Sequence, residues 1–203
     1  MSPRHSAEDA LQTRTAIVET GTRQASIEGL EGMTIGRLAG ALGLSKAGVI
    51  GPFGSKQALQ LAVLGEAVRM FTEEVWVPVA RLPAGRARLR AVSEHWIAYL
   101  SDCPLPGGCF ITTASTEWDA REGPVRDAVA VAQRRWLDTL RADAEVAVRA
   151  GELPDTTDPT ELAFALNGIA MSLNQAIQLF NDDAAPDRAR RTMARLLAPP
   201  AER

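Results

Sequence analysis

The sequence predicts an all-α protein of about nine helices, with an N-terminal three-helix domain followed by a larger C-terminal helical domain. Three observations predict this class. Alanine, leucine, valine and arginine are abundant and aromatic residues make up only 5% of the chain, which favours helices over sheets. Apolar residues recur three and four positions apart along most of the chain. Helix-capping residues and Gly or Pro breaks separate these periodic segments.

The composition limits the class of protein. The chain has 203 residues, 46% apolar and 23% charged, as expected for one large or two small globular domains. No apolar run approaches the ~20 residues that span a membrane, no signal-peptide pattern opens the chain, and two cysteines do not make a disulfide framework. We therefore expect a cytoplasmic protein without a membrane partner.

The first predicted helix covers residues 7 to 29, and the stretch from Thr34 to Lys56 follows it. Thr34 is a suitable N-cap, Gly43 suits a helix end that needs positive φ, and Ser45 can cap a second short helix. The apolar positions of the two helices repeat at helical spacing: Ile35, Leu38, Ala39, Leu42, Val49 and Phe53. This is the pattern of a helix-turn-helix, which places its second helix in the major groove of DNA.

A third helix of the pattern begins at Ser55 and Lys56. Pro52 cannot donate a backbone hydrogen bond, so the second helix of the motif is expected to end near Gly51. Ser55 then caps a helix that runs to about residue 77. A lysine at a helix N-terminus can bind a phosphate, so Lys56 is a candidate DNA contact.

Residues 10 to 70 resemble the TetR family of transcriptional regulators. The residues that carry the resemblance are Thr34, Ile35, Leu38, Ala39, Gly43, Ser45, Lys46, Phe53, Ser55, Lys56, Ala58 and Leu59. Residues 103–127 also look like the ligand-binding domain of one branch of the family. The resemblance implies a DNA-binding domain over residues 1–56 and a ligand-binding and dimerisation domain over 57–203. It also implies a homodimeric regulator, usually a repressor, that binds a palindromic operator and is released by a small-molecule inducer.

The motif and the resemblance together predict these DNA-binding residues: Thr34, Arg37, Ser45, Lys46, Ala47, Gly48, Ser55 and Lys56. Ala47 and Gly48 are too small for bidentate base contacts, so Arg37 is the best side chain for a guanine or the minor groove. The chain departs from its relatives at residues 50–52, where they usually carry aromatic or imidazole side chains that bind phosphates. The charge bias is small, with a formal net charge of +1 over residues 1–56 and −4 over the remainder.

The rest of the chain predicts five further helices, over residues 86–100, 110–120, 125–150, 159–180 and 187–197, with Asp158 as an N-cap before Pro159. Large aromatic and a few polar side chains along these segments suit a pocket for a drug-sized apolar ligand. The predicted lining residues are Trp96, Tyr99, Phe110, Thr113, Glu117, Trp118 and Trp136. Core packing explains each of these residues equally well.

Segment 159–180 carries a stripe of Asn167, Met171, Asn174 and Gln178 on an otherwise apolar helix. Buried amides need hydrogen-bond partners, so the stripe faces either a ligand cavity or a symmetric partner. Asn167, Met171 and Asn174 are therefore candidate ligand contacts. The resemblance implies that this helix and the last one form a four-helix dimer interface, for which the candidates are Phe164, Leu173, Ile177, Met193, Leu196 and Leu197.

The sequence offers little support for an enzyme. It shows no nucleophile–base arrangement, no P-loop and no metal-ligand spacing, and we expect neither a cofactor nor a metal. His95, beside Trp96, is best explained as a structural histidine. Cys103 and Cys109 bracket a Pro-Gly turn and are either small buried residues, which we favour, or a redox-sensitive pair. The alternative function is therefore a ligand-binding or redox-responsive dimer whose helix-turn-helix has degenerated.

Overall fold

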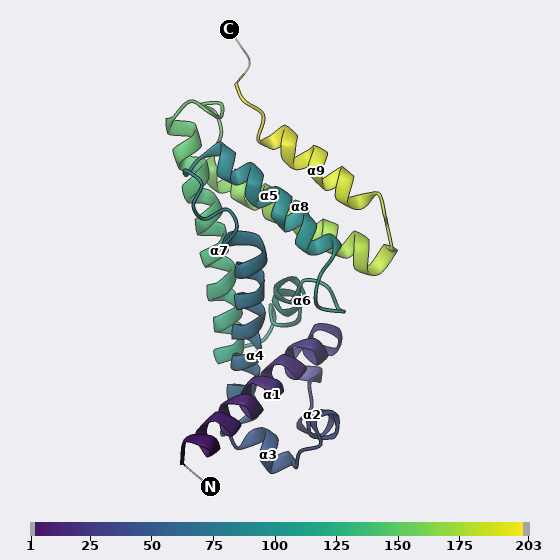
Figure 1. Cartoon of the computed structure of the whole chain (residues 1–203). Coiled ribbons are helices and arrows are strands. Elements are labelled where there is room, and N and C mark those ends of the chain that lie inside the picture. The colour runs from purple at the N-terminus through teal and green to yellow at the C-terminus, as the bar shows by residue number, and fades with distance from the viewer. Residues whose placement is uncertain (1–2, 201–203) are drawn as a thin grey trace. The chain divides into compact units, whose positions relative to one another are not determined.

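The computed structural model describes residues 3–200, with side chains from residue 8 onward. Within this range the chain forms nine α-helices, one π-helical turn and no strand. Figure 1 shows the course of the chain through the labelled helices. The prediction of an all-α protein is confirmed.

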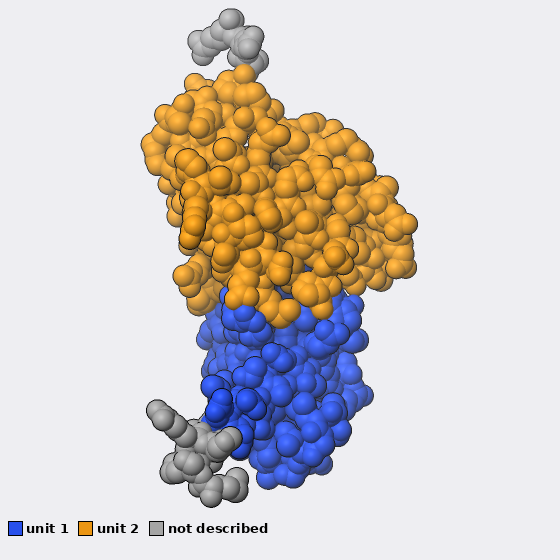
Figure 2. Space-filling view, viewed as in Figure 1, with its two compact units in different colours: residues 1–69, 105–130 blue, residues 70–104, 131–203 orange. Residues whose placement is uncertain are grey.

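The chain divides into two compact units (Figure 2). Unit 1 holds residues 1–69 and 105–130, and unit 2 holds residues 70–104 and 131–203. The domain boundary predicted after residue 56 falls inside unit 1, at the first residue of a helix. Unit 1 also takes in residues 105–130 because this later segment packs on the first helix of the chain.

Unit 1 is built from α1 (Pro3–Gly32), α2 (Ile35–Leu42), α3 (Lys46–Ile50), most of α4 (Lys56–Phe71), α6 (Phe110–Glu117) and the start of α7 (Pro124–Arg149). Regular helix geometry in α1 stops at Gly29, where φ is 78°. One face of each helix supplies the core of the unit. Its fully buried side chains include Ile17, Leu30, Met33, Leu38, Val49, Leu59 and Val63.

The helix-turn-helix forms with the predicted caps. The Thr34 hydroxyl accepts the Arg37 N–H at 3.3 Å, and the Ser45 hydroxyl accepts the Gly48 N–H at 2.9 Å. Gly43 adopts the left-handed conformation, with φ 64° and ψ 26°. Each cap satisfies a backbone group that a helix end would otherwise leave unpaired. The local sequence therefore determines where α2 and α3 begin and where α2 ends.

Unit 2 holds the end of α4, the π-helical turn η1 (Thr72–Trp76), α5 (Arg86–Ser101), the rest of α7, α8 (Pro159–Phe180) and α9 (Ala185–Leu196). Helix α5 packs against η1, α8 and α9. The Asp158 carboxylate caps α8 by accepting the N–H groups of Glu161 and Thr160, and these hydrogen bonds lower the pKa of Asp158. Helix α9 begins two residues before the predicted start, because Asp182 accepts the Ala184 N–H at 3.0 Å and shapes the preceding turn.

Replacing Gly43 by alanine should lower the free energy of unfolding by about 1–2 kcal/mol. A Cβ at this position would meet no atom within 4 Å, so the loss is the strain of a left-handed alanine alone. Gly40 is the matched control, because it lies inside α2 and its added Cβ also meets nothing within 4 Å. Gly40→Ala should stabilise the protein by up to ~1 kcal/mol. Chemical unfolding followed by circular dichroism measures the stability change of both variants. Equal changes would contradict the left-handed conformation assigned to Gly43.

Candidate nucleic-acid interface and ligand pocket

The start of α3 presents an exposed polar surface. Ser45, Lys46, Ala47 and Gly48 are all exposed, whereas Val49 is fully buried and anchors the helix on α2. Of the other predicted contacts, Thr34, Arg37 and Ser55 are exposed and Lys56 is half-buried. The Ser55 hydroxyl accepts the Ala58 N–H at 3.0 Å and so caps α4 as predicted.

Two of the three predicted cations are already paired with acidic groups near the end of α1. Arg37 forms an ion pair with Glu28. The Lys56 ammonium donates to the Glu31 carbonyl at 2.9 Å and lies 3.7 Å from the Glu31 carboxylate. Lys46 has no acidic partner in the described part of the chain. Lys46 is therefore the cation of the motif that can approach a phosphate without first leaving a carboxylate.

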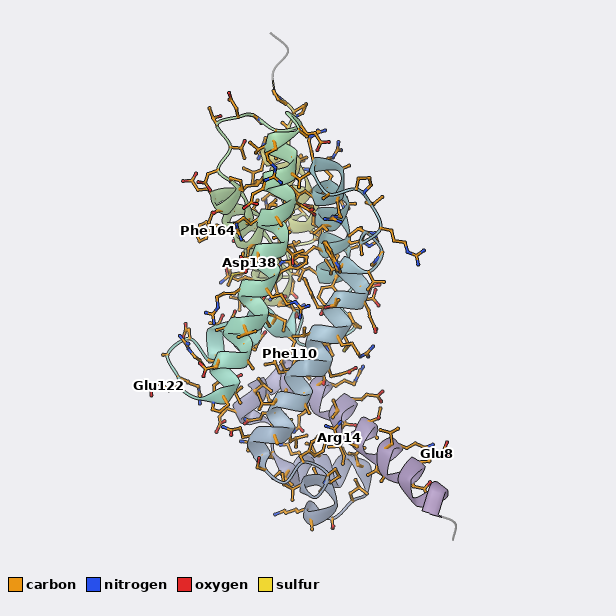
Figure 3. All side chains as sticks on the ribbon, turned by 90° about the vertical axis from the view of Figure 1, so that its left-hand side faces the viewer. Glu8, Arg14, Phe110, Glu122, Asp138 and Phe164 are labelled. Atoms are coloured by element: carbon orange, nitrogen blue, oxygen red, sulfur yellow. The ribbon has the colours of Figure 1, made fainter. Side chains whose placement is uncertain are left out.

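Arg14 on α1 is a further cation of this surface that sequence reasoning did not select. Its guanidinium lies 4.9 Å from the centre of the Phe53 ring, in the turn after α3, and Figure 3 shows Arg14 on α1. The contact joins residues 39 positions apart in the chain, so no local pattern could indicate it. Arg14 is exposed, so its charge remains available to solvent beside the ring.

In unit 2, three of the predicted pocket residues form one aromatic cluster. Trp96, Tyr99 and Trp136 surround Phe71, with ring centres 6.0, 5.5 and 4.9 Å from it, and each pair is close to perpendicular. Such edge-to-face contacts are favourable beyond the area they bury. The Trp136 indole N–H is buried and has no hydrogen-bond partner among the residues that the structure describes. Phe71, at the end of α4, was missed because it follows an ordinary amphipathic helix pattern.

The other predicted pocket residues belong to unit 1. Phe110 and Trp118 are buried there and Thr113 is half-buried. The Trp118 indole N–H likewise finds no hydrogen-bond partner in the described part of the chain. Glu117 accepts the backbone N–H groups of Leu30 and Glu31, at 2.8 Å each.

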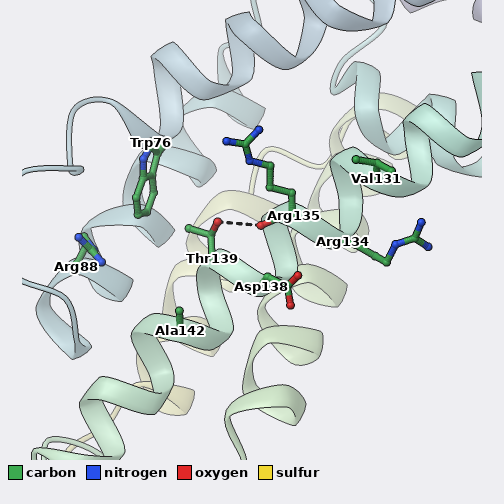
Figure 4. A pocket seen from close by; sticks show the side chains of 8 residues that line it. All are labelled: Trp76, Arg88, Val131, Arg134, Arg135, Asp138, Thr139 and Ala142. Atoms are coloured by element: carbon green, nitrogen blue, oxygen red, sulfur yellow. Dashed lines mark hydrogen bonds between the residues drawn. The ribbon is translucent and has the colours of Figure 1, made fainter.

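Unit 2 also has an open groove of about 620 Å³ along α7 (Figure 4). Its cations are Arg88, Arg134 and Arg135. The Arg88 guanidinium donates a hydrogen bond of 2.8 Å to the buried Asp143, and this bond raises the pKa of Arg88. The same guanidinium lies over the Trp76 ring, 5.1 Å from its centre. The complete lining is Trp76, Arg88, Val131, Arg134, Arg135, Asp138, Thr139 and Ala142. None of these residues was selected from the sequence, because helical spacing does not distinguish a groove from a solvated face.

The amide stripe of α8 is partly buried inside unit 2. Asn174 is buried, while Asn167 and Met171 are half-buried. The Asn167 amide nitrogen donates to the Met171 sulfur at 3.4 Å. Among the candidate dimer residues, Phe164 is 76% exposed and Leu196 38% exposed. Ile177 is half-buried.

Three other candidate dimer residues are buried within the chain itself. Leu173, Met193 and Leu197 are at least 97% buried within the chain itself. Their side chains fill the contacts of α8 and α9 with each other and with α5. They contribute to the core of unit 2 and offer little surface to a partner.

Both cysteines are present as thiols rather than as a disulfide. Cys103 is half-buried and Cys109 is buried. Burial raises the pKa of the Cys109 thiol, which lowers its share of reactive thiolate.

Within the described residues, no group of three or more His, Cys, Asp or Glu side chains is placed to hold a metal ion. None of the described helices is both long enough and apolar enough to cross a membrane.

Comparisons with known proteins agree with this architecture. The family model described as tetracyclin repressor-like, C-terminal domain matches residues 85–193. The fold is similar to that of a TetR transcriptional regulator from Chloroflexus aurantiacus J-10-FL, with a TM-score of 0.85 and 23% identity over 93% of this chain and 95% of that chain. No curated protein matched the chain.

Two similar structures were solved with ligands. AibR in complex with isovaleryl coenzyme A and operator DNA has a TM-score of 0.77 and 23% identity, over 92% of this chain and 99% of that chain. A putative transcriptional regulator from Saccharomonospora viridis in complex with choline has a TM-score of 0.75 and 22% identity, over 92% of this chain and 95% of that chain. At these identities the likeness shows a shared fold.

We expect iodoacetamide to modify Cys103 well before Cys109 in the folded protein at pH 8. The thiolate is the reacting form, Cys109 is buried while Cys103 is half-buried, and burial raises the pKa of the Cys109 thiol. Peptide mass spectrometry over time measures the two rates, and the same labelling in denaturant is the control in which they should become similar. Equal rates in the folded protein would contradict the burial of Cys109 and favour the redox alternative.

Proposed function

Because the chain belongs to the TetR family of transcriptional regulators, we propose that it binds a palindromic operator as a homodimer and that a small molecule controls this binding. The observation that carries the proposal is the helix-turn-helix of α2 and α3, with both N-caps formed and residues 45–48 exposed. Two such motifs related by a twofold axis fit half-sites one or more helical turns apart.

In the proposed complex the start of α3 enters the major groove. The small side chains of Ala47 and Gly48 let the backbone approach the base edges, and the alanine methyl can contact a thymine methyl. Lys46 binds phosphate directly, since no carboxylate of the described residues pairs with it. Arg37 and Lys56 reach DNA by exchanging Glu28 and Glu31 for phosphates. The absence of aromatic side chains at residues 50–52 places more of the affinity on these cations.

The proposed effector site includes the aromatic cluster of unit 2. Phe71, Trp96, Tyr99 and Trp136 offer apolar rings, and the unpartnered Trp136 N–H can donate to an acceptor on a ligand. A drug-sized apolar molecule with a carbonyl or ether oxygen has this chemistry. Ligands bound to regulators of the same fold, isovaleryl coenzyme A and choline, support an effector site without identifying the effector. We propose that the effector releases DNA, as in a repressor.

The proposed dimer forms through the exposed face of α8 with a contribution from α9. Phe164 and Leu179 are 76% and 64% exposed and lie toward opposite ends of α8, while Leu196 is exposed on α9. Large exposed apolar side chains on one helix are typical of interfaces. Gly168 lies between them, and a Cβ there would meet nothing within 4 Å, which leaves room for a close approach of a second copy.

The test of the function is fluorescence anisotropy of the purified protein with a labelled duplex from the region upstream of its own gene, over a series of salt concentrations. An affinity for this duplex that is high and exceeds the affinity for a random duplex supports the proposed function as a transcriptional regulator. Weak binding that is equal on both duplexes, in the absence of an effector, favours the alternative of a dimer with a degenerated helix-turn-helix.

Replacing Lys46 by alanine should weaken binding to all duplexes and reduce the slope of log affinity against log salt by about one per protomer. The reason is the loss of one phosphate contact and its released counterion. Arg90→Ala is the control, because Arg90 is an exposed cation of α5 in unit 2 and the variant carries the same charge change. Equal salt slopes for the two variants would remove Lys46 from the interface.

Replacing Phe164 by glutamate should shift the protein from dimer toward monomer. The change places a charge on an apolar side chain that the dimer would bury. Size-exclusion chromatography with light scattering measures the mass over a dilution series. Val131→Glu, at a 57% exposed position of α7, is the control. A Phe164→Glu variant that stays dimeric would exclude this face of α8 as the interface.

A further inference from the structure

The junction between α1 and α2 is held by a carboxylate from a distant part of the chain. At Gly29 the backbone leaves the helix with φ 78° and ψ 164°, and the next two N–H groups point to Glu117, the last residue of α6. Glu117 accepts the Leu30 N–H through Oε2 and the Glu31 N–H through Oε1, both at 2.8 Å. Hydrogen bonds from two amides to one carboxylate are among the stronger kind in proteins.

This geometry requires a glycine at position 29. A Cβ there would lie 2.7 Å from a Glu117 carboxylate oxygen, which is closer than such atoms come. The positive φ is also unfavourable for any other residue. The contact thus depends on two residues that are 88 positions apart in the sequence. Gly29 turns the backbone, and the Glu117 carboxylate accepts the next two N–H groups.

The carbonyl groups of the same two residues are held from α4. The Gln60 side chain, only 4% exposed, donates to the Leu30 carbonyl at 2.9 Å and to the Glu31 carboxylate at 3.2 Å. Lys56 donates to the Glu31 carbonyl at 2.9 Å. The backbone of Leu30 and Glu31 is therefore fixed through its N–H groups by α6 and through its carbonyl groups by α4.

The loop before α6 makes a second close contact with α1. The Gly107 N–H donates to the Ser26 hydroxyl at 3.3 Å, and a Cβ at Gly107 would lie 1.7 Å from the Ser26 carbonyl oxygen. No side chain fits there. The segment 107–117 thus contacts the end of α1 at both of its own ends, so α6 cannot shift without disturbing this junction.

The junction in turn positions the helix-turn-helix. Leu30 and Met33 are both 1% exposed, and the Met33 N–H donates to the Gly29 carbonyl at 3.2 Å. Thr34, the N-cap of α2, follows directly. Only two residues, Gly32 and Met33, separate Glu31 from this cap, so the held backbone lies close to the start of α2.

We propose that Glu117 is a positioning residue for DNA binding: its carboxylate fixes the α1–α2 junction, so that α6 sets the orientation of the helix-turn-helix through Leu30 and Glu31. The inference rests on the proposed function, since it concerns affinity for DNA. It gives α6 a specific route to α2, and any ligand that displaces α6 would act along this route.

Charge provides a test that separates positioning from general electrostatics. Removing a carboxylate from a DNA-binding unit should by itself strengthen binding, because the protein becomes less negative. Loss of positioning predicts the opposite sign. Glu122 is the matched control: it is exposed in the loop between α6 and α7 of the same unit (Figure 3) and makes no hydrogen bond or ion pair within the described residues.

The experiment compares Glu117→Gln with Glu122→Gln in the full-length protein. Glutamine offers one carbonyl oxygen where Glu117 offers two, and its NH2 group faces the second N–H donor. We expect amide exchange at Leu30 and Glu31 to become about tenfold faster in Glu117→Gln, and affinity for the upstream duplex to fall by about tenfold, or ~1.4 kcal/mol. Glu122→Gln should keep the wild-type exchange rates and bind DNA as tightly or slightly more tightly.

Each outcome decides the proposal. Unchanged exchange at Leu30 and Glu31 would overturn the contact itself, and faster exchange with unchanged or tighter DNA binding would overturn the positioning role. If Glu117→Gln does not fold, as judged by circular dichroism, Glu117→Asp keeps the charge on a shorter side chain and is held to the same criteria. A wild-type protein that binds no duplex would overturn the proposed function instead, and the exchange rates would still decide whether Glu117 holds the junction.

Discussion

The hydrogen-bonding requirement of helix ends is the constraint on which unit 1 depends. A helix leaves backbone groups unpaired at each end, and buried ones need partners. Thr34, Ser45 and Ser55 satisfy such groups from within their own turns. The end of α1 has no local solution: Gly29 turns the backbone, and the carboxylate that receives the next two N–H groups comes from α6. The position of α2 therefore depends on a residue outside the motif.

The same end of α1 controls the charges available for DNA. Glu28 pairs with Arg37, and Glu31 holds Lys56 through its carbonyl and its carboxylate. In the unbound protein these cations stabilise the junction between α1, α2 and α4. In the proposed complex they exchange a carboxylate for a phosphate, so part of the gain from each phosphate contact is offset by the ion pair that is lost. Such pairs are exposed and individually weak, which makes the exchange feasible.

The aromatic residues of unit 2 pack against one another and also belong to the proposed effector site. Phe71, Trp96, Tyr99 and Trp136 contact one another edge to face, which is ordinary core packing. Yet the buried Trp136 N–H has no acceptor within residues 8–200, and a buried donor left unpaired is costly. A ligand that supplies the acceptor would remove this cost. Packing and ligand binding are therefore compatible explanations of the cluster.

The sequence by itself determined the features that local chemistry controls. The helix class, the caps at Thr34, Ser45 and Asp158, the left-handed Gly43 and the end of α3 before Pro52 all depend on residues within a few positions of each other. Only the tertiary structure decided which apolar faces are buried and which partners distant side chains find. It assigned Leu173, Met193 and Leu197 to the core of unit 2 and Glu117 to the α1–α2 junction. The physical reason is that helical spacing defines a face of a helix, while the element that covers this face is set by packing between segments far apart in the chain.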